Sequence, residues 1–131
     1  MIKTDKVIID SVEGRCIVRN IAMGKWTPED VQFLTDNLLE LAKPFAGKKW
    51  AYVGDPTKLY PIFTKETSAA FAKLHVDLEA AGCKVIAFLD GNTAGMKLQS
   101  QKHQDSSNTN LQVLHFKNFE QASDWLKEIG I

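Results

Sequence analysis

The sequence predicts an α/β fold: a single mixed, mostly parallel sheet with an N-terminal antiparallel hairpin and about four helices. Two β-rich segments at the start of the chain flank a short turn, and strand-like segments then alternate with amphipathic helical ones. The segment 84–89 is apolar on both faces, which is typical of a central strand covered on each side by helices. With 131 residues and 44% hydrophobic residues, we expect one domain spanning 1–131.

The hairpin is predicted from segments 7–10 and 16–21, because Glu13 and Gly14 supply a turn between them. A helix should follow from Thr27, whose hydroxyl can cap free backbone N–H groups, with Pro28 at the first helical position. Apolar residues at helical spacing then give this helix a buried face that lasts until Pro44.

The rest of the chain continues the alternation of strands and helices. We predict a strand at 49–54, a helix from about 64 to 81, a strand at 84–89, a weaker Gln-rich helix at 93–104, a strand at 111–116 and a last helix from 118. Gly82 is expected to end the second helix in a left-handed cap, and Asn118 with Gln121 resembles a capping box.

The charge balance excludes some classes of function. Sixteen basic residues match sixteen acidic ones, so the chain lacks the basic field that non-specific nucleic-acid binding needs. No signal peptide or membrane-spanning run is apparent, and Cys16 and Cys83 are too far apart to form a metal-ligand motif. We therefore expect a cytoplasmic protein with two reduced thiols.

Three segments carry a resemblance to a known family: 50–55, the run Ala-Gly-Cys-Lys-Val-Ile-Ala-Phe at 81–88, and 116–126. With this order of elements, the chain resembles the SpoIIAA-like proteins. These share the fold of the anti-sigma-factor-antagonist (STAS) domains and are related in fold to CRAL-TRIO lipid-binding domains. The resemblance covers nearly the whole chain, and it implies a fold and a binding role rather than an activity.

One departure from that family concerns its phosphorylation switch. Classical anti-sigma antagonists carry a serine pair where a strand meets the second helix, and one serine is phosphorylated to change partners. Here the junction at 54–64 is longer and more apolar, and it lacks the pair. The nearest hydroxyls, which are the candidate phosphorylation sites, are Thr64, Thr67 and Ser68.

The same junction contains an unusually apolar run, in which Leu59, Tyr60, Ile62 and Phe63 surround Pro61. Pro56 and Pro61 are expected to prevent a regular helix or a central strand there. One interpretation is that the run folds back onto the core. The alternative is a flap over an apolar cavity, or a patch that touches membranes.

Trp26, just before the first helix, either joins this patch or packs as a hydrophobic staple. A homodimer would also hide the apolar run.

Asp55 and Asp90 each follow a predicted strand, so both carboxylates should lie at the edge where open α/β sheets place ligands. Such a pair can bind Mg²⁺ or transfer protons, but Asp-Pro and Asp-Gly are also common turn dipeptides, and we favour turns. No catalytic motif, metal site or cofactor site is evident, and the three histidines are expected to be packed.

Three hypotheses follow. The favoured one is a non-enzymatic binding module for an apolar or amphipathic, lipid-like small molecule, with reversible peripheral contact with membranes. The alternative is a STAS-type regulatory module that binds a protein partner without the usual phosphoserine. An enzyme that uses Asp55 and Asp90 ranks third.

Overall fold

The computed structural model of the chain describes residues 1–90, 101, 103, 107 and 109–131, and it has one six-stranded sheet. The strands are β1 (Ile2–Lys3), β2 (Val7–Ser11), β3 (Ile17–Gly24), β4 (Trp50–Leu59), β5 (Cys83–Leu89) and β6 (Gln112–Phe116). Their order in the sheet is their order in the chain. β1, β2 and β3 pair antiparallel, whereas β3 to β6 are parallel. The predicted mixed sheet with an N-terminal hairpin is confirmed.

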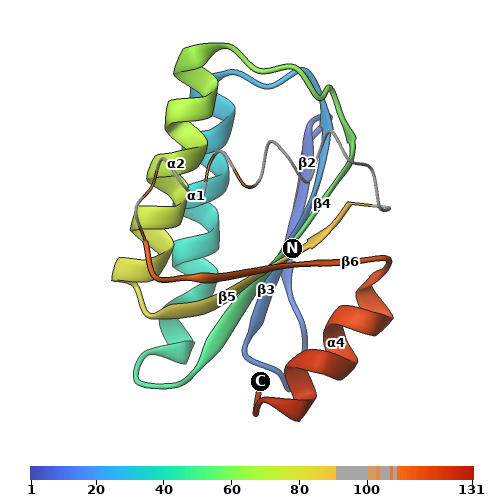
Figure 1. The fold of residues 1–131 in the computed structure, drawn as a ribbon, viewed down its shortest axis with the longest axis vertical. Helices are drawn as coiled ribbons and strands as arrows, with labels where there is room; N and C mark the ends of the chain where they lie inside the picture. The colour runs from blue at the N-terminus through green and yellow to red at the C-terminus, as the bar shows by residue number, and fades with distance from the viewer. Residues whose placement is uncertain (91–100, 102, 104–106, 108) are drawn as a thin grey trace.

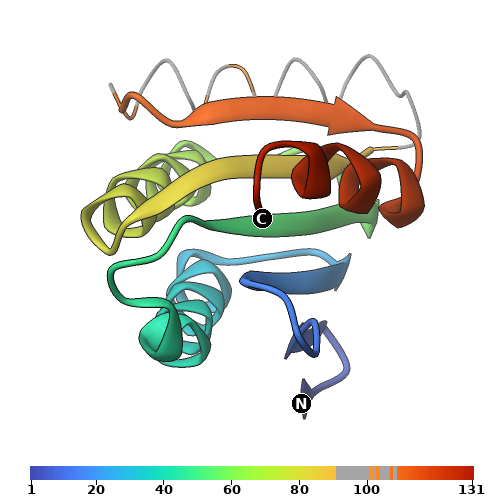
Figure 2. The same cartoon turned by 90° about the horizontal axis from the view of Figure 1, so that it is seen from below.

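Helices cover both faces of the sheet. In Figure 1, α1 (Pro28–Ala42) and α2 (Lys65–Ala80) lie to the left of the sheet, and α4 (Phe119–Glu128) lies to its lower right. Figure 2 shows α4 in front of the strands, across the middle of the sheet. A short 3-10 turn, η1 (Lys43–Phe45), follows α1. The helix predicted at 93–104 falls almost entirely outside the described residues.

The predicted helix starts are confirmed at α1 and α2. Thr27 accepts a hydrogen bond from the Asp30 backbone N–H, and the Asp30 carboxylate accepts one from the Thr27 N–H, which completes a capping box. Thr64 caps α2 by accepting from the Thr67 N–H at 3.1 Å. Gly82 ends α2 with a φ of 97°, in the left-handed region that favours glycine.

At α4 the predicted capping box is only half right. Asn118 accepts from the Gln121 N–H at 2.9 Å, as expected of an N-cap. The Gln121 side chain instead accepts from the Lys117 N–H at 3.0 Å, one residue before the cap. The return hydrogen bond therefore stabilises the turn from β6 into α4 rather than the cap itself.

The sheet separates two apolar clusters. The larger lies under α1 and α2 and includes Leu38, Trp50 and Leu78. The smaller lies under α4 and includes Val53 and Leu126. Side chains along a strand alternate between the two faces of the sheet. β4 and β5 carry buried apolar residues on both faces, as expected of strands inside the sheet.

The structure corrects the prediction for Pro56. Pro56 lies within the central strand β4, which extends to Leu59, not in a turn after it. β4 pairs with β5 only as far as Gly54, and its register with β3 shifts between Ile21 and Met23. Beyond Gly54 one side of β4 has no ladder partner in β5, so a residue without an N–H is tolerated there.

Both cysteines are free, as predicted, and they differ in environment. Cys16 is partly exposed, whereas Cys83 is buried and its thiol donates to the Val85 carbonyl at 3.3 Å. Burial raises the pKa of the Cys83 thiol to about 12, because a thiolate would lose its hydration there. Cys83 is therefore a packing residue rather than a reactive nucleophile.

Candidate functional site

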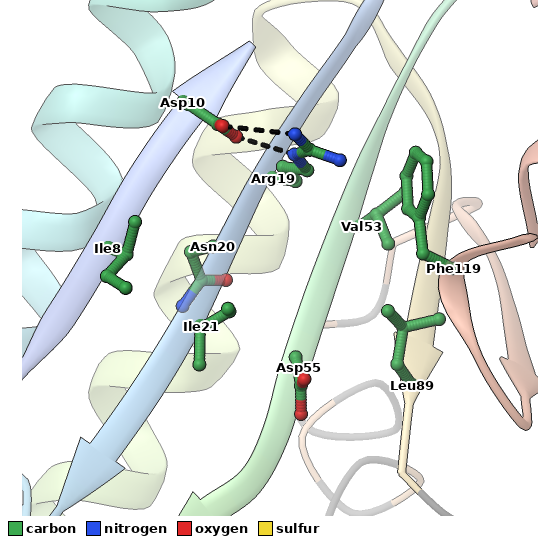
Figure 3. Close-up of a pocket in the computed structure, with 9 residues that line it drawn as sticks. All are labelled: Ile8, Asp10, Arg19, Asn20, Ile21, Val53, Asp55, Leu89 and Phe119. Carbon is green, nitrogen blue, oxygen red and sulfur yellow. Dashed lines mark hydrogen bonds and ion pairs between the residues drawn. The ribbon is translucent and has the colours of Figure 1, made fainter. Parts of the chain in front are cut away.

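A cleft of about 310 Å³ opens on the α4 side of the sheet, where β2, β3 and the ends of β4 and β5 extend past the helix (Figure 3). It arises because α4 has only ten residues and packs mainly against β4, β5 and β6. Among the described residues, no helix covers the outward-facing residues of β2 and β3 as α1 and α2 cover the opposite face.

The cleft has an apolar lining. Its five apolar residues are Ile8, Ile21, Val53, Leu89 and Phe119. The four strand residues share the α4 side of the sheet because strand side chains alternate between faces. Phe119 comes from the first residue of α4 and closes one wall. This lining gives an apolar ligand a surface to cover.

An ion pair borders one end of the cleft. Arg19 donates from Nε to Oδ1 of Asp10 at 2.7 Å and from Nη2 to Oδ2 at 3.2 Å, so the pair is bidentate. The guanidinium carbon also lies 4.8 Å from the centre of the Phe119 ring, within the range of cation–π contacts. Arg19 thus contacts both β2 and α4 at this end of the cleft.

Asp55 lies further along the same cleft. Its partner across the ladder is Ile21, and its Oδ1 accepts from the backbone N–H of Thr57 at 3.0 Å and from the Thr57 hydroxyl. Asp55 belongs to β4, whereas the sequence placed it in a turn after the strand. The expectation that Asp55 reaches a ligand-binding edge still fits its place in this cleft.

Asp90 is not among the residues that line the cleft. It is fully buried and pairs with Nδ1 of His115, whose ring stacks on Phe88 at 5.9 Å. Phe88 packs into the cluster under α1 and α2, whereas Leu89, beside Asp55, packs into the cluster under α4. Asp90 is therefore engaged with His115, whereas Asp55 lines the cleft. In the described part of the chain, no group of three metal-ligating side chains is found.

The apolar run at 59–63 is divided between core and surface. Leu59 and Trp26 are 8% and 5% exposed and belong to the cluster under α1 and α2. The ring of Phe71 packs against Phe63, at 5.1 Å between ring centres, and against Trp26, at 6.1 Å. In the structure, these three predicted residues pack in or against the cluster under α1 and α2.

Tyr60 and Ile62 form the exposed part of the run, at 48% and 68% exposure. The cavity below the run, which Trp26, Leu59 and Phe71 help to line, measures about 30 Å³. Such a space suits roughly one water molecule, so a lipid-sized ligand does not fit there without a change of conformation.

The three candidate hydroxyls differ in accessibility. Thr64 is exposed and acts as the N-cap of α2. Thr67 is 1% exposed, and its hydroxyl lies 3.0 Å from that of Thr64. Ser68 is half-buried on the first turn of the helix. Two of the three hydroxyls thus have structural roles at the start of α2.

A solved structure with the same architecture is that of an uncharacterised protein of the DUF3478 family from Shewanella loihica PV-4, described as having a SpoIIAA-like fold. The two superpose with a TM-score of 0.69 over 96% of this chain and 99% of that one, at 17% sequence identity. The chain has a SpoIIAA-like fold. Its sequence matches no protein-family model, and a search of curated proteins finds no match.

Within this SpoIIAA-like fold, sequence reasoning missed most of the cleft. It singled out Asp55 but not Asp10, Arg19 or Phe119. One signal was present: Asp10 and Arg19 are opposite charges at corresponding positions of the two hairpin strands. The missing element was the length of α4, which decides how much of the sheet it leaves uncovered.

No helix among the described residues is both long enough and apolar enough to cross a membrane.

Proposed function

We propose that the chain is a non-enzymatic binding module that holds an amphipathic small molecule in the cleft of Figure 3. The observation that carries the proposal is the combination of size and lining. A volume of about 310 Å³ lies at the lower end of the range typical of small-molecule pockets. Five apolar residues beside a few polar ones are also the usual composition of such pockets.

The cleft is preferred to the space under the apolar run because the two differ about tenfold in volume. Leu59, Trp26 and Phe63 are engaged with the core and Phe71, so opening that space would expose large apolar side chains. The cleft needs no such rearrangement, because it is open already.

The experiment blocks the cleft and measures binding of a neutral amphiphile, phenylbutanol, by saturation-transfer NMR and isothermal titration calorimetry. Ile21→Trp places an indole in the cleft and is expected to weaken binding by at least about tenfold. Val76→Trp is the matched control, because Val76 is 44% exposed on α2, on the opposite side of the sheet. Circular dichroism of both variants checks that each is folded before binding is compared.

Two results would contradict the proposal: equal binding by Ile21→Trp and the wild type, or no binding of phenylbutanol by the wild type. Native mass spectrometry of the purified protein adds an independent readout. A co-purifying small mass in the wild type that is absent from Ile21→Trp supports the cleft and identifies the natural ligand by weight.

A STAS-type interaction with a protein, or peripheral contact with a membrane, is the second candidate. The observation that favours it is the exposure of Tyr60 and Ile62 between Lys58 and Lys65, which are exposed as well. Tyrosine and lysine suit a polar–apolar boundary. Phenylbutanol binding that survives Ile21→Trp but is lost in Ile62→Ser would favour the exposed residues Tyr60 and Ile62 over the cleft.

A further inference from the structure

We infer that the ligand of the cleft is a cationic amphiphile, with an ammonium group against Asp55 and an apolar body over Ile21, Val53 and Leu89. This inference rests on the proposed function and names the chemical class of its ligand. It starts from the charges that border the cleft, which are Asp10, Arg19 and Asp55.

The charges at one end of the cleft cancel. Arg19 and Asp10 form a bidentate ion pair with distances of 2.7 and 3.2 Å. Their side chains are 39% and 25% exposed, so the pair is partly shielded from water. An incoming carboxylate would find Nε and Nη2 of Arg19 already bonded to Asp10.

Asp55 keeps its charge uncompensated. The hydrogen bonds recorded to its side chain come from Thr57, through a backbone N–H and a hydroxyl, and both donors are neutral. Among the residues that the structure describes, no lysine, arginine or histidine lies within ion-pair distance of Asp55. The described residues that line the cleft therefore carry one net negative charge, which favours a cation and repels an anion.

The register sets the spacing between the two ends. Arg19 lies opposite Val53 and Ile21 lies opposite Asp55, so Asp55 is two residues further along the strands than the ion pair. At roughly 3.3 Å per residue, this separates the two ends by about 7 Å. The apolar side chains of Ile21, Val53 and Leu89 lie around this interval (Figure 3). A ligand with one charged end and an apolar body matches that arrangement.

The test compares three probes with one skeleton: phenylbutylamine, phenylbutanol and phenylbutanoate, titrated by calorimetry at pH 7. The amine is charged at this pH, and we expect it to bind about tenfold more tightly than the alcohol, with the carboxylate weakest. Asp55→Asn should reduce amine binding to the level of the alcohol and leave alcohol binding unchanged. Asp124→Asn, at an exposed position of α4, is the control that changes net charge equally.

Salt provides a second readout on the wild-type protein. Raising the ionic strength should weaken amine binding and leave alcohol binding unchanged, because screening acts on charges alone. This measurement keeps the inference testable if Asp55→Asn fails to fold.

The outcomes separate the two proposals. A carboxylate or alcohol that binds as tightly as the amine overturns the cationic ligand but leaves the cleft as a binding site. An amine preference that survives in Asp55→Asn overturns the role of Asp55. The absence of phenylbutanol binding by the wild type overturns the proposed function itself.

Discussion

Trp50→Ala is expected to lower the free energy of unfolding by about 3–5 kcal/mol, the usual cost of removing a buried tryptophan from a core. Trp50 is 1% exposed at the start of β4, in the cluster under α1 and α2. Its Nε1 donates to the Ala81 carbonyl at 3.2 Å, just after the end of α2, and its ring contacts Phe45. Urea denaturation followed by circular dichroism measures the loss.

Trp125→Ala is the matched control for this prediction. Trp125 lies on α4, is partly exposed and packs against Phe116 at 5.9 Å between ring centres. It should cost clearly less than Trp50→Ala, because less of its surface is removed from water on folding. Equal losses for the two variants would mean that Trp50 does not anchor the main core.

Gly54→Ala is expected to destabilise the protein by about 2 kcal/mol or more, by overpacking and by disturbing a buried hydrogen bond. A Cβ on Gly54 would lie 2.7 Å from the hydroxyl oxygen of Tyr52 and 3.3 Å from a Phe88 ring carbon. The Tyr52 hydroxyl donates to Asn20 Oδ1, and both side chains are buried. The ring therefore cannot move aside without breaking that bond.

A double-mutant cycle with Tyr52→Phe checks this mechanism. Tyr52→Phe removes the atom that the new methyl group would meet, at the cost of the Asn20 hydrogen bond. We expect the double variant to be more stable than the sum of the two single losses predicts, because both changes break the same contact. Additive losses, measured by the same denaturation, would show that Gly54 and Tyr52 act independently.

The fold was predictable because local signals agreed with one another. Thr27 with Pro28, Thr64 and Gly82 mark helix ends through backbone chemistry that is confined to a few residues. The segment 84–89, which is apolar on both faces, indicated the buried strand β5. Such signals do not depend on distant parts of the chain, so the sequence displays them directly.

Pro56 shows where local signals fail. Its missing N–H argued against a central strand, and the conclusion was wrong because β5 stops pairing with β4 at Gly54. Whether a backbone N–H is needed at position 56 depends on the neighbouring strand β5, which lies about thirty residues further along the chain. The same applies to Asp90, whose partner His115 lies on β6.

The candidate site was largely hidden from the sequence for a similar reason. The apolar run at 59–63 attracted attention because it is apolar and contains a proline, yet Leu59 and Phe63 complete the core. The cleft instead comes from ordinary alternating strand residues that the ten-residue α4 leaves accessible. The cleft depends on the length of α4 and on the width of the six-stranded sheet, and no single segment of the sequence specifies both.

The claim that the cleft is the ligand site is tested most directly by a ¹⁵N–¹H NMR titration of the wild-type protein with phenylbutanol. We expect the largest chemical-shift changes on the backbone amides that line the cleft: Ile8, Ile21, Val53, Leu89 and Phe119. Changes confined to Trp26 and to residues 59–63, or no saturable change at all, would contradict it.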